Sequence, residues 1–233
     1  MHTHPLNPNL HLTYESDWDI FPVLHQQNGL VVEYLQKIQG VIDTALQRHP
    51  RTLVIRCDLR FPQYQTIHYD SAVISRFIES LKAQIQHDQH VKASSGQRVH
   101  PCELRYVWVK EHVGSEFPHY HVALFLNRDS YFNLGQFQQS TMIPIPDTPV
   151  DQSYFRESAN NMAGRIMQAW SSALRLHESM TIGLVHFPEN PFYALHIEDV
   201  VVYSEVFKRL SYFAKADTKQ YGDGTRWFGA SRR

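Results

Sequence analysis

Two histidines stand two residues apart at the start of an apolar run, in the stretch PHYHVALFLN (residues 118–127). Residues two apart on a β-strand point to the same face, so His119 and His121 project together from the beginning of the strand. Beyond them both faces of the run are apolar, which predicts a central strand. Imidazole is a common metal ligand, and the end of a strand leaves room for an ion. The alternative is a pair of surface histidines that only make hydrogen bonds.

Two imidazoles do not complete a metal site, so a third ligand is required. Glu111 ends the preceding β-rich run, ELRYVWVKE. If residues 112–118 form a hairpin loop, Glu111 lies opposite His119 across the two strands, within reach of a shared ion. His112 and Glu116, in the loop itself, are less regular alternatives. Two histidines and one carboxylate leave coordination positions open, as a catalytic ion requires.

A tyrosine on the last predicted helix, SEVFKRLSYFAKAD (204–217), is the candidate nucleophile. On a helical wheel the apolar residues fill one arc, and Tyr212 lies opposite that arc together with Lys208 and Lys215. A phenol flanked by two ammonium groups suits attack on a phosphodiester, because the cations attract the phosphate and stabilise negative charge on the oxygen. The alternative is a half-exposed tyrosine that only packs.

The elements that must position these residues predict an α+β fold, with helices packed on one mostly antiparallel sheet. A Pro- and His-rich arm over residues 1–25 is followed by helical spacing from Asn28 to His49. The other expected elements are a strand at 52–57, a helix from Asp70, a loop at 92–97, a hairpin of 103–111 and 119–127, a chain break at 144–149, a helix from about Asp151, strands near 182–187 and 192–197, and a helix from Ser204 to about Lys215.

Composition and charge restrict the partners and the compartment. The chain has 233 residues, 42% of them hydrophobic, and a net charge of −1. Residues 204–233 hold seven Lys/Arg against three Asp/Glu, a net +4, which leaves −5 for the remainder. Contact with nucleic acid must therefore come from a local patch. Two cysteines, no apolar leader and no long apolar run predict a reduced, cytoplasmic protein without a membrane span.

The His-x-His strand followed by the Tyr-x-x-Lys of YFAK resembles the HUH single-strand endonucleases, which include rolling-circle replication initiators and relaxases. More closely, VIRCDLRFP, the WVKE run before PHYHVALFLN, YFAKADTK and the closing RWFGASRR look like the inovirus gene-II-like replication proteins, the YagK/YfjJ family of phages and prophages. The resemblance covers the chain from about residue 50. It implies an N-terminal arm and helix over 1–49 and a catalytic domain over 50–233, with a five-stranded, mostly antiparallel sheet flanked by helices.

The resemblance also implies roles for individual residues. His119, His121 and Glu111 would bind Mg²⁺ or Mn²⁺, with Zn²⁺ also able to occupy such a site. Tyr212 would be the nucleophile, with Lys215 as its helper at the phosphate. DNA contacts would come from Arg56, Asp58 and Arg60 in the family's first motif. The positive charge of the C-terminal segment indicates further contacts to phosphates, from Lys208, Lys215, Lys219, Arg226, Arg232 and Arg233. Trp227 and Phe228, next to Arg226, could stack on unpaired bases.

Two groups of these predicted DNA contacts have alternative structural roles. The first motif could be a cluster of charges at a strand end, and Trp227 and Phe228 could pack the tail onto the domain instead of stacking on bases. No second tyrosine lies inside the last helix, which predicts a one-tyrosine cycle.

The function implied is metal-dependent, sequence-specific nicking and joining of single-stranded or hairpin origin DNA through a 5′-phosphotyrosine, which initiates rolling-circle replication of a phage, prophage or related element. A host helicase or polymerase would act after the nick. The alternative within the same fold is a catalytically silent DNA-binding protein that acts as a repressor or replication modulator. A cupin-like metalloenzyme fits less well, because only 10 glycines accompany several long helical patterns. A purely structural phage protein leaves the polar Tyr/Lys face unexplained.

Overall fold

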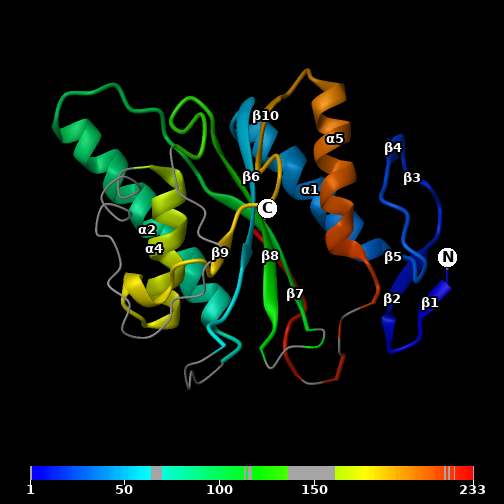
Figure 1. Cartoon of the computed structure of the whole chain (residues 1–233). Coiled ribbons are helices and arrows are strands. Elements are labelled where there is room, and N and C mark those ends of the chain that lie inside the picture. The colour runs from blue at the N-terminus through cyan, green and yellow to red at the C-terminus, as the bar shows by residue number, and fades with distance from the viewer. Residues whose placement is uncertain are drawn as a thin grey trace.

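The computed structural model describes residues 2–63, 70–112, 114, 117–135, 161–217, 219, 221–222 and 224–232. Its centre is a six-stranded sheet with the order β10-β6-β8-β7-β11, in which the short β9 also pairs with β6. The strands are β6 (Arg51–Leu59), β7 (Arg105–Glu111), β8 (His119–Asn127), β9 (Val185–His186), β10 (Phe192–His196) and β11 (Phe228–Ala230). Every pairing in this sheet is antiparallel (Figure 1). The predicted α+β class is confirmed, with six strands in this sheet instead of five.

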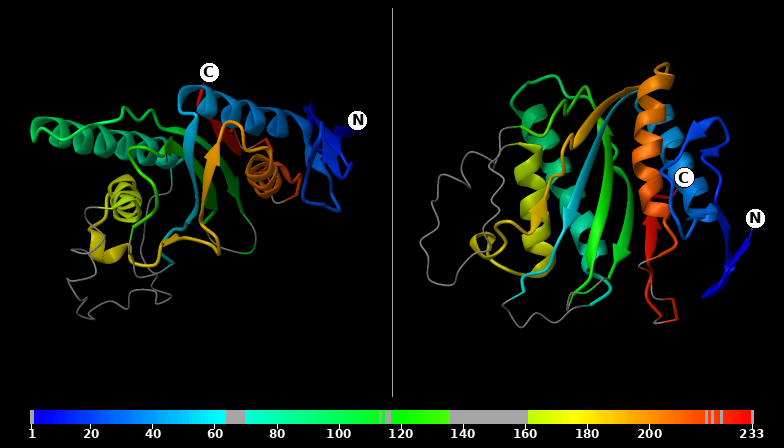
Figure 2. Two further views of the ribbon diagram at one scale, coloured as in Figure 1. Left: turned by 90° about the horizontal axis from the view of Figure 1, so that it is seen from above. Right: turned by 45° about the vertical axis from the view of Figure 1, so that its right-hand side comes forward.

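Helices cover both faces of the sheet, as the view from above shows (Figure 2). On one face lie α2 (Val73–Ser94) and α4 (Met162–Leu174), which pack against each other. On the other lie α1 (Val32–Arg48) and α5 (Val200–Ser211). The sheet is therefore the middle layer of three, and its strand ends are the places where functional side chains can reach solvent.

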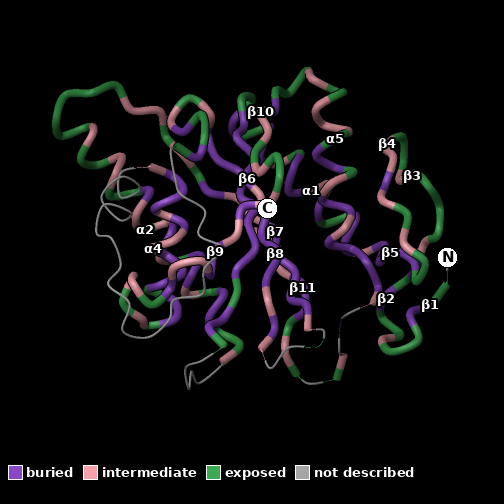
Figure 3. The backbone as a smooth tube through the Cα atoms, in the orientation of Figure 1, coloured by how far each residue is buried: buried purple, intermediate pink, exposed green. Residues whose placement is uncertain are grey.

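The middle strand β8 separates two hydrophobic cores. Its alternate residues Tyr120, Val122 and Leu124 belong to the core shared with α2 and α4. Ala123 and Phe125 belong to the core shared with α1 and α5. Both sets are buried, and burial runs along the central strands (Figure 3). Because each fully buried large apolar side chain contributes about 1.5–3 kcal/mol, these two cores hold the strand ends in fixed register.

The N-terminal segment is ordered into strands, where an irregular arm was expected. β1 (His2–His4), β2 (Asn7–Thr13) and β5 (Leu30–Val31) form a three-stranded sheet, and β3 (Asp17–Trp18) pairs with β4 (Phe21–Pro22). The helix that follows begins at Val32, not at Asn28, and no side chain caps it. Leu35 of α1 and Phe207 of α5 lie in one core, so the helix completes that core. The division into 1–49 and 50–233 stays a prediction.

Other element boundaries differ from the predicted ones for local reasons. α2 continues to Ser94, into the segment expected to be a loop. α5 begins at Val200, not at Ser204, because the Asp199 side chain accepts a hydrogen bond from the Val202 amide at 3.0 Å and caps the helix. The strand β11 was not predicted. Glu116, Arg233, the break at 144–149 and the helix start near Asp151 lie outside the described residues. Within the described part of the chain, no helix is long and apolar enough to cross a membrane.

Gly229 is required by the close approach of β11 to β7. It pairs with Trp108, and a Cβ added at Gly229 would overlap the Trp108 indole ring. We expect Gly229→Ala to lower the free energy of unfolding by about 1–3 kcal/mol, because the buried ring must move to make room. Urea denaturation of the variant and its parent measures this difference, and equal midpoints would contradict the packing described.

Candidate functional site

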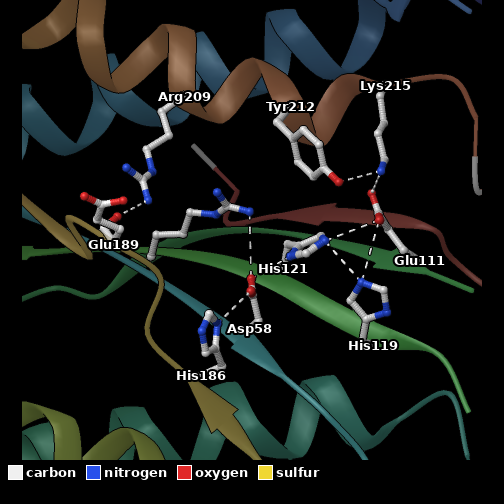
Figure 4. A network of polar contacts seen from close by, with 10 residues as sticks. Asp58, Glu111, His119, His121, His186, Glu189, Arg209, Tyr212 and Lys215 are labelled. Carbon is white, nitrogen blue, oxygen red and sulfur yellow. Dashed lines mark hydrogen bonds and ion pairs between the residues drawn. The ribbon is translucent and has the colours of Figure 1, made fainter. Parts of the chain in front are cut away.

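Strand register brings the predicted metal ligands together at one end of the sheet. Glu111 of β7 pairs directly with His119 of β8, and Asp58 of β6 pairs with His121 on the other side. The strands β7 and β8 end and begin at the predicted residues 111 and 119. Alternate residues share a face, so Glu111, His119, His121 and Asp58 all project toward α5 (Figure 4).

Three ligand atoms converge closely enough for one ion. His119 Nε2 and His121 Nε2 lie 3.2 Å apart. Glu111 Oε2 lies 3.3 Å from His121 Nε2 and 3.7 Å from His119 Nε2. Ligand atoms about 2.0–2.2 Å from a metal lie roughly 3–3.5 Å from one another, so the triangle has the right size. The Glu111/His119/His121 group could therefore hold a metal ion.

His121 is oriented by a carboxylate behind it. Its Nδ1 donates a hydrogen bond to Asp58 Oδ1 at 2.6 Å, which leaves Nε2 directed toward Glu111 and His119. The other oxygen of Asp58 lies 3.3 Å from His186 Nδ1. A carboxylate on the second ring nitrogen is the usual support of a metal-binding histidine. Asp58 was predicted to contact DNA, but in the structure it is buried and hydrogen-bonded to His121. The sequence analysis did not identify His186.

The charges around His121 favour a cation at this position. Burial would lower the pKa of His121, but the hydrogen bonds to Asp58 and Glu111 outweigh burial and raise it. Burial likewise opposes ionisation of Asp58 and Glu111, yet the hydrogen bonds with His121 bring the pKa of each down to about 2. Both carboxylates are therefore charged at neutral pH. The charge that attracts a proton to His121 would equally attract a metal ion in its place.

Asp58→Asn tests the orienting contact. The amide keeps the shape of the side chain but removes the charge behind His121, so we expect affinity for Mn²⁺ to fall about 10–100-fold. Isothermal titration calorimetry with Mn²⁺ measures the change. Asp129→Asn is a matched control, since Asp129 pairs with Arg51 at a partly exposed position of the chain. Equal loss in both variants, or no loss in either, would contradict the role given to Asp58.

The predicted nucleophile lies directly over this group. Tyr212 begins a short 3₁₀ turn, η2 (Tyr212–Ala214), immediately after α5. Its ring meets the His121 ring edge-on, with centroids 5.5 Å apart. Phe213 and Ala214 of the same turn are buried in the core, which anchors the turn above the sheet. The spatial meeting of the last helix with the histidine strand, expected from sequence, is present.

Lys215 joins the tyrosine to the ligand group. Its Nζ donates to the Tyr212 hydroxyl at 2.6 Å and lies 3.0 Å from Glu111 Oε1. Burial would lower the pKa of Lys215, but these two contacts outweigh burial and raise it, so the amine is charged. Lys215 is buried instead of lying on an exposed helix face with Lys208. A positive charge thus sits beside the oxygen that would become negative during attack.

Glu111 connects the ligand group to Lys215. Its Oε1 is buried and lies 3.0 Å from Lys215 Nζ, while its Oε2 faces the two histidines. The donor set and the triangle of ligand atoms together fit a divalent cation.

Arg56 lies beside the tyrosine turn and Asp58. Its guanidinium lies 5.5 Å from the ring centroids of both Tyr212 and Phe213 and 3.8 Å from Asp58. The Nε atom is buried without a hydrogen-bond partner in the described part of the chain. Arg56 therefore brings a planar cation next to the tyrosine.

The remaining predicted DNA contacts divide into exposed and buried residues. Arg60, Lys208, Arg226 and Arg232 are exposed. Lys219 is buried and donates to the Lys215 carbonyl oxygen, and burial lowers its pKa to about 8. Trp227 and Phe228 are buried too, with Phe228 in β11 beside β7. The packing alternative for these two aromatic residues is the one that the structure shows, and Lys219 supports the Tyr212 turn from within.

Comparison with known proteins places the chain near two relatives whose activities are unassigned. The model of the family described as "YagK/YfjJ C-terminal domain" matches residues 13–231, so the similarity begins well before the residue 50 expected from the motifs. The chain is 33% identical over 213 residues to "Uncharacterized protein YagK" of Escherichia coli (strain K12), covering 87% of this chain and 93% of that protein. It is 32% identical over 212 residues to "Uncharacterized protein YfjJ" of the same organism, covering 85% and 93%. No solved structure matches the chain.

Proposed function

We propose that this chain, which belongs to the YagK/YfjJ C-terminal domain family, nicks and rejoins single-stranded DNA through a covalent link to Tyr212. The observation that supports this most strongly is the contact chain from nucleophile to metal ligands. The Tyr212 hydroxyl accepts a hydrogen bond from Lys215 Nζ at 2.6 Å, and this amine lies 3.0 Å from Glu111, which faces His119 and His121 (Figure 4). A phosphate seated among these groups would contact all of them.

The chemical step is an in-line displacement at phosphorus. The Tyr212 oxygen forms a bond to phosphorus while the bond from phosphorus to the 3′ oxygen breaks. The phenol loses its proton and the departing 3′ oxygen gains one, so the products are a 5′-phosphotyrosine and a free 3′-OH. Attack of a 3′-OH on the phosphotyrosine reverses the step. The free energy of the broken phosphodiester bond is retained in the phosphotyrosine bond, so joining requires no ATP.

The residues of the chain have separate tasks in this step. Lys215 holds the Tyr212 oxygen in place and stabilises negative charge on it. Arg56 is placed to receive an oxygen of the phosphate, since its guanidinium lies beside the Tyr212 ring. Asp58 keeps His121 in the orientation that binds metal. Phe213 and the turn around it exclude water from one side of the tyrosine.

Mg²⁺ or Mn²⁺ is the proposed cofactor, held by His119, His121 and Glu111. When bound, the ion would supply positive charge to a nonbridging oxygen of the phosphate. Two imidazoles and one carboxylate also suit Zn²⁺, so the ligand types alone do not select the ion.

The proposed biological role is initiation of rolling-circle replication of a phage, prophage or related element. The nick leaves a 3′-OH that primes a polymerase, and a helicase would separate the strands behind it. The exposed cations Arg60, which follows β6, and Lys208, one helical turn before Tyr212, would hold the DNA backbone.

A cleavage assay tests the proposal. Labelled single-stranded and hairpin oligonucleotides from the DNA that flanks the gene are incubated with the protein and Mn²⁺, then run on a denaturing gel. We expect a nicked product together with a slower band that protease removes, and neither band in the presence of EDTA. Tight, sequence-specific binding without any nick would instead support the catalytically silent DNA-binding protein.

A further inference from the structure

A second feature outside the metal group is a groove beside the edge of the large sheet. It has a volume of about 880 Å³ and lies between α1, the N-terminal strand β2 and the edge strand β11. Tyr34 of α1 and Phe228 of β11 stack at its base, with ring centroids 4.2 Å apart and planes 10° apart. The stacking fixes the two walls relative to each other, so the groove is a built part of the fold.

The charged side chains around this groove are mostly cationic. Among the described residues that line it, they are Lys37, Arg105, Arg226 and Arg232, with one carboxylate, that of Glu33. Glu33 is already engaged, because both its oxygens accept hydrogen bonds from His11, at 2.7 and 3.0 Å. Arg105 is also engaged, because it forms an ion pair with Glu103 at 2.6 Å, whereas Lys37, Arg226 and Arg232 are exposed. The groove therefore presents net positive charge to whatever enters it.

Neutral polar groups line the walls together with these cations. They include Asn9, Gln36, Thr44 and Ser231. Cations accompanied by amide and hydroxyl groups suit a chain of phosphates whose sugars and bases need polar contacts. A compact anion such as a free phosphate would use only one end of such a channel.

The groove is connected to the proposed catalytic site through strand β7. Arg105 and Glu111 lie six residues apart on β7 and so share a face, about 20 Å from each other at the usual strand rise. The Lys110 amide donates to the Trp227 carbonyl oxygen at 2.9 Å, so the segment that leads into the groove lies next to Glu111. On the other wall, Lys219 lies over the Tyr34 ring at 5.9 Å and bonds to the Lys215 carbonyl oxygen.

We propose that this groove binds the phosphate backbone of the single-stranded DNA that flanks the scissile phosphate, an inference that rests on the proposed function. The strand would leave the Tyr212 site at the Glu111 end of β7 and run along the groove, over the stacked Tyr34 and Phe228, toward Arg232. The contacts are to phosphates, so binding here is independent of base sequence and depends strongly on salt.

Charge reversal on the two walls tests the inference. Lys37→Glu and Arg226→Glu change one exposed residue on each wall, and Lys82→Glu on α2, across the sheet, is the matched control. All three are made in a Tyr212→Phe background, so that no probe is cleaved. Fluorescence anisotropy of a labelled single-stranded 25-mer is recorded as a function of salt. We expect the Lys37→Glu/Arg226→Glu double variant to bind roughly 10-fold or more weakly, with a salt slope smaller by about two.

The inference is overturned if the double variant binds as Lys82→Glu does, with an unchanged salt slope and an unchanged melting temperature. A nicking assay on the same proteins with Tyr212 intact separates this failure from failure of the proposed function. If the parent nicks DNA and the groove variants bind as tightly as the control, the groove proposal is wrong and the proposed function stands. If the groove variants bind more weakly but the parent does not nick DNA, the endonuclease proposal is wrong and the groove is a DNA-binding site.

Discussion

Tyr212→Phe is expected to abolish the covalent protein–DNA product, with a loss of at least ~10³-fold in nicking rate. The substitution removes only the hydroxyl, which is the attacking atom and the partner of Lys215 at 2.6 Å. The ring stays, together with its contacts to His121 and the Arg56 guanidinium. Denaturing gels of the reaction with labelled DNA and Mn²⁺ measure both the adduct and the nick.

The control for this variant is Tyr203→Phe, on α5, the helix that leads into the Tyr212 turn. Tyr203 donates to Asp43 at 2.7 Å, away from the histidine pair, so its loss should leave the adduct intact. Adduct formation by Tyr212→Phe at the parental rate would show that another residue is the nucleophile. An equal loss of adduct in both variants would show that the packing of the helix, and not the Tyr212 hydroxyl, determines the activity.

His121→Ala is expected to have the second largest effect, with nicking reduced roughly 10²-fold or more and Mn²⁺ affinity reduced in parallel. The substitution removes one ligand of the proposed ion. It also leaves Asp58 buried without its closest partner, at 2.6 Å, so the melting temperature must be recorded beside the activity. Single-turnover rates against Mn²⁺ concentration separate a loss of metal affinity from a loss of rate at saturation.

His196→Ala provides a control at an exposed histidine of β10. Full metal-dependent nicking by a folded His121→Ala protein would remove His121 from the ligand set. Because ligands of one ion act together, the double variant His119→Ala/His121→Ala should be little worse than His121→Ala alone. Additive losses would indicate that the two histidines act separately.

The ligand triangle could be predicted because it depends on two local rules. Alternation along β8 sets His119 and His121 on one face, and the hairpin length sets Glu111 opposite His119. Both rules act over a few residues, so sequence spacing is enough to apply them. Tyr212 required one long-range assumption, that the last helix packs on this face, and its buried arc of apolar residues was correctly identified.

Asp58 and Lys215 show where sequence reasoning reached its limit. A charged residue is normally exposed, so the family resemblance assigned Asp58 to DNA contact, and helical spacing placed Lys215 on an open helix face. The structure buries both, because each finds a partner of opposite charge on another strand, His121 and Glu111 respectively. Those pairings depend on which strands are neighbours, and periodicity within one segment carries no such information. Lys219, predicted as a DNA contact, is likewise buried, with the Lys215 carbonyl oxygen as its partner.

The edge of the sheet was unpredictable for a different reason. β11 is only three residues long and includes Gly229, so it carries no strand signal of its own. It becomes a strand because Trp108 covers the glycine and Phe228 stacks on Tyr34. The N-terminal strands likewise form through pairing with one another and with β5, which a Pro- and His-rich composition does not reveal.

The most direct measurement is identification of the residue that carries DNA after cleavage. The adduct is trimmed with nuclease, digested with trypsin and analysed by mass spectrometry. Cleavage after Arg209 and Lys215 releases the peptide LSYFAK, in which Tyr212 is the single tyrosine. We predict a nucleotide 5′-phosphate mass on Tyr212 of this peptide. A nucleotide on any other residue, or nicked DNA with no modified peptide, would contradict the proposed chemistry.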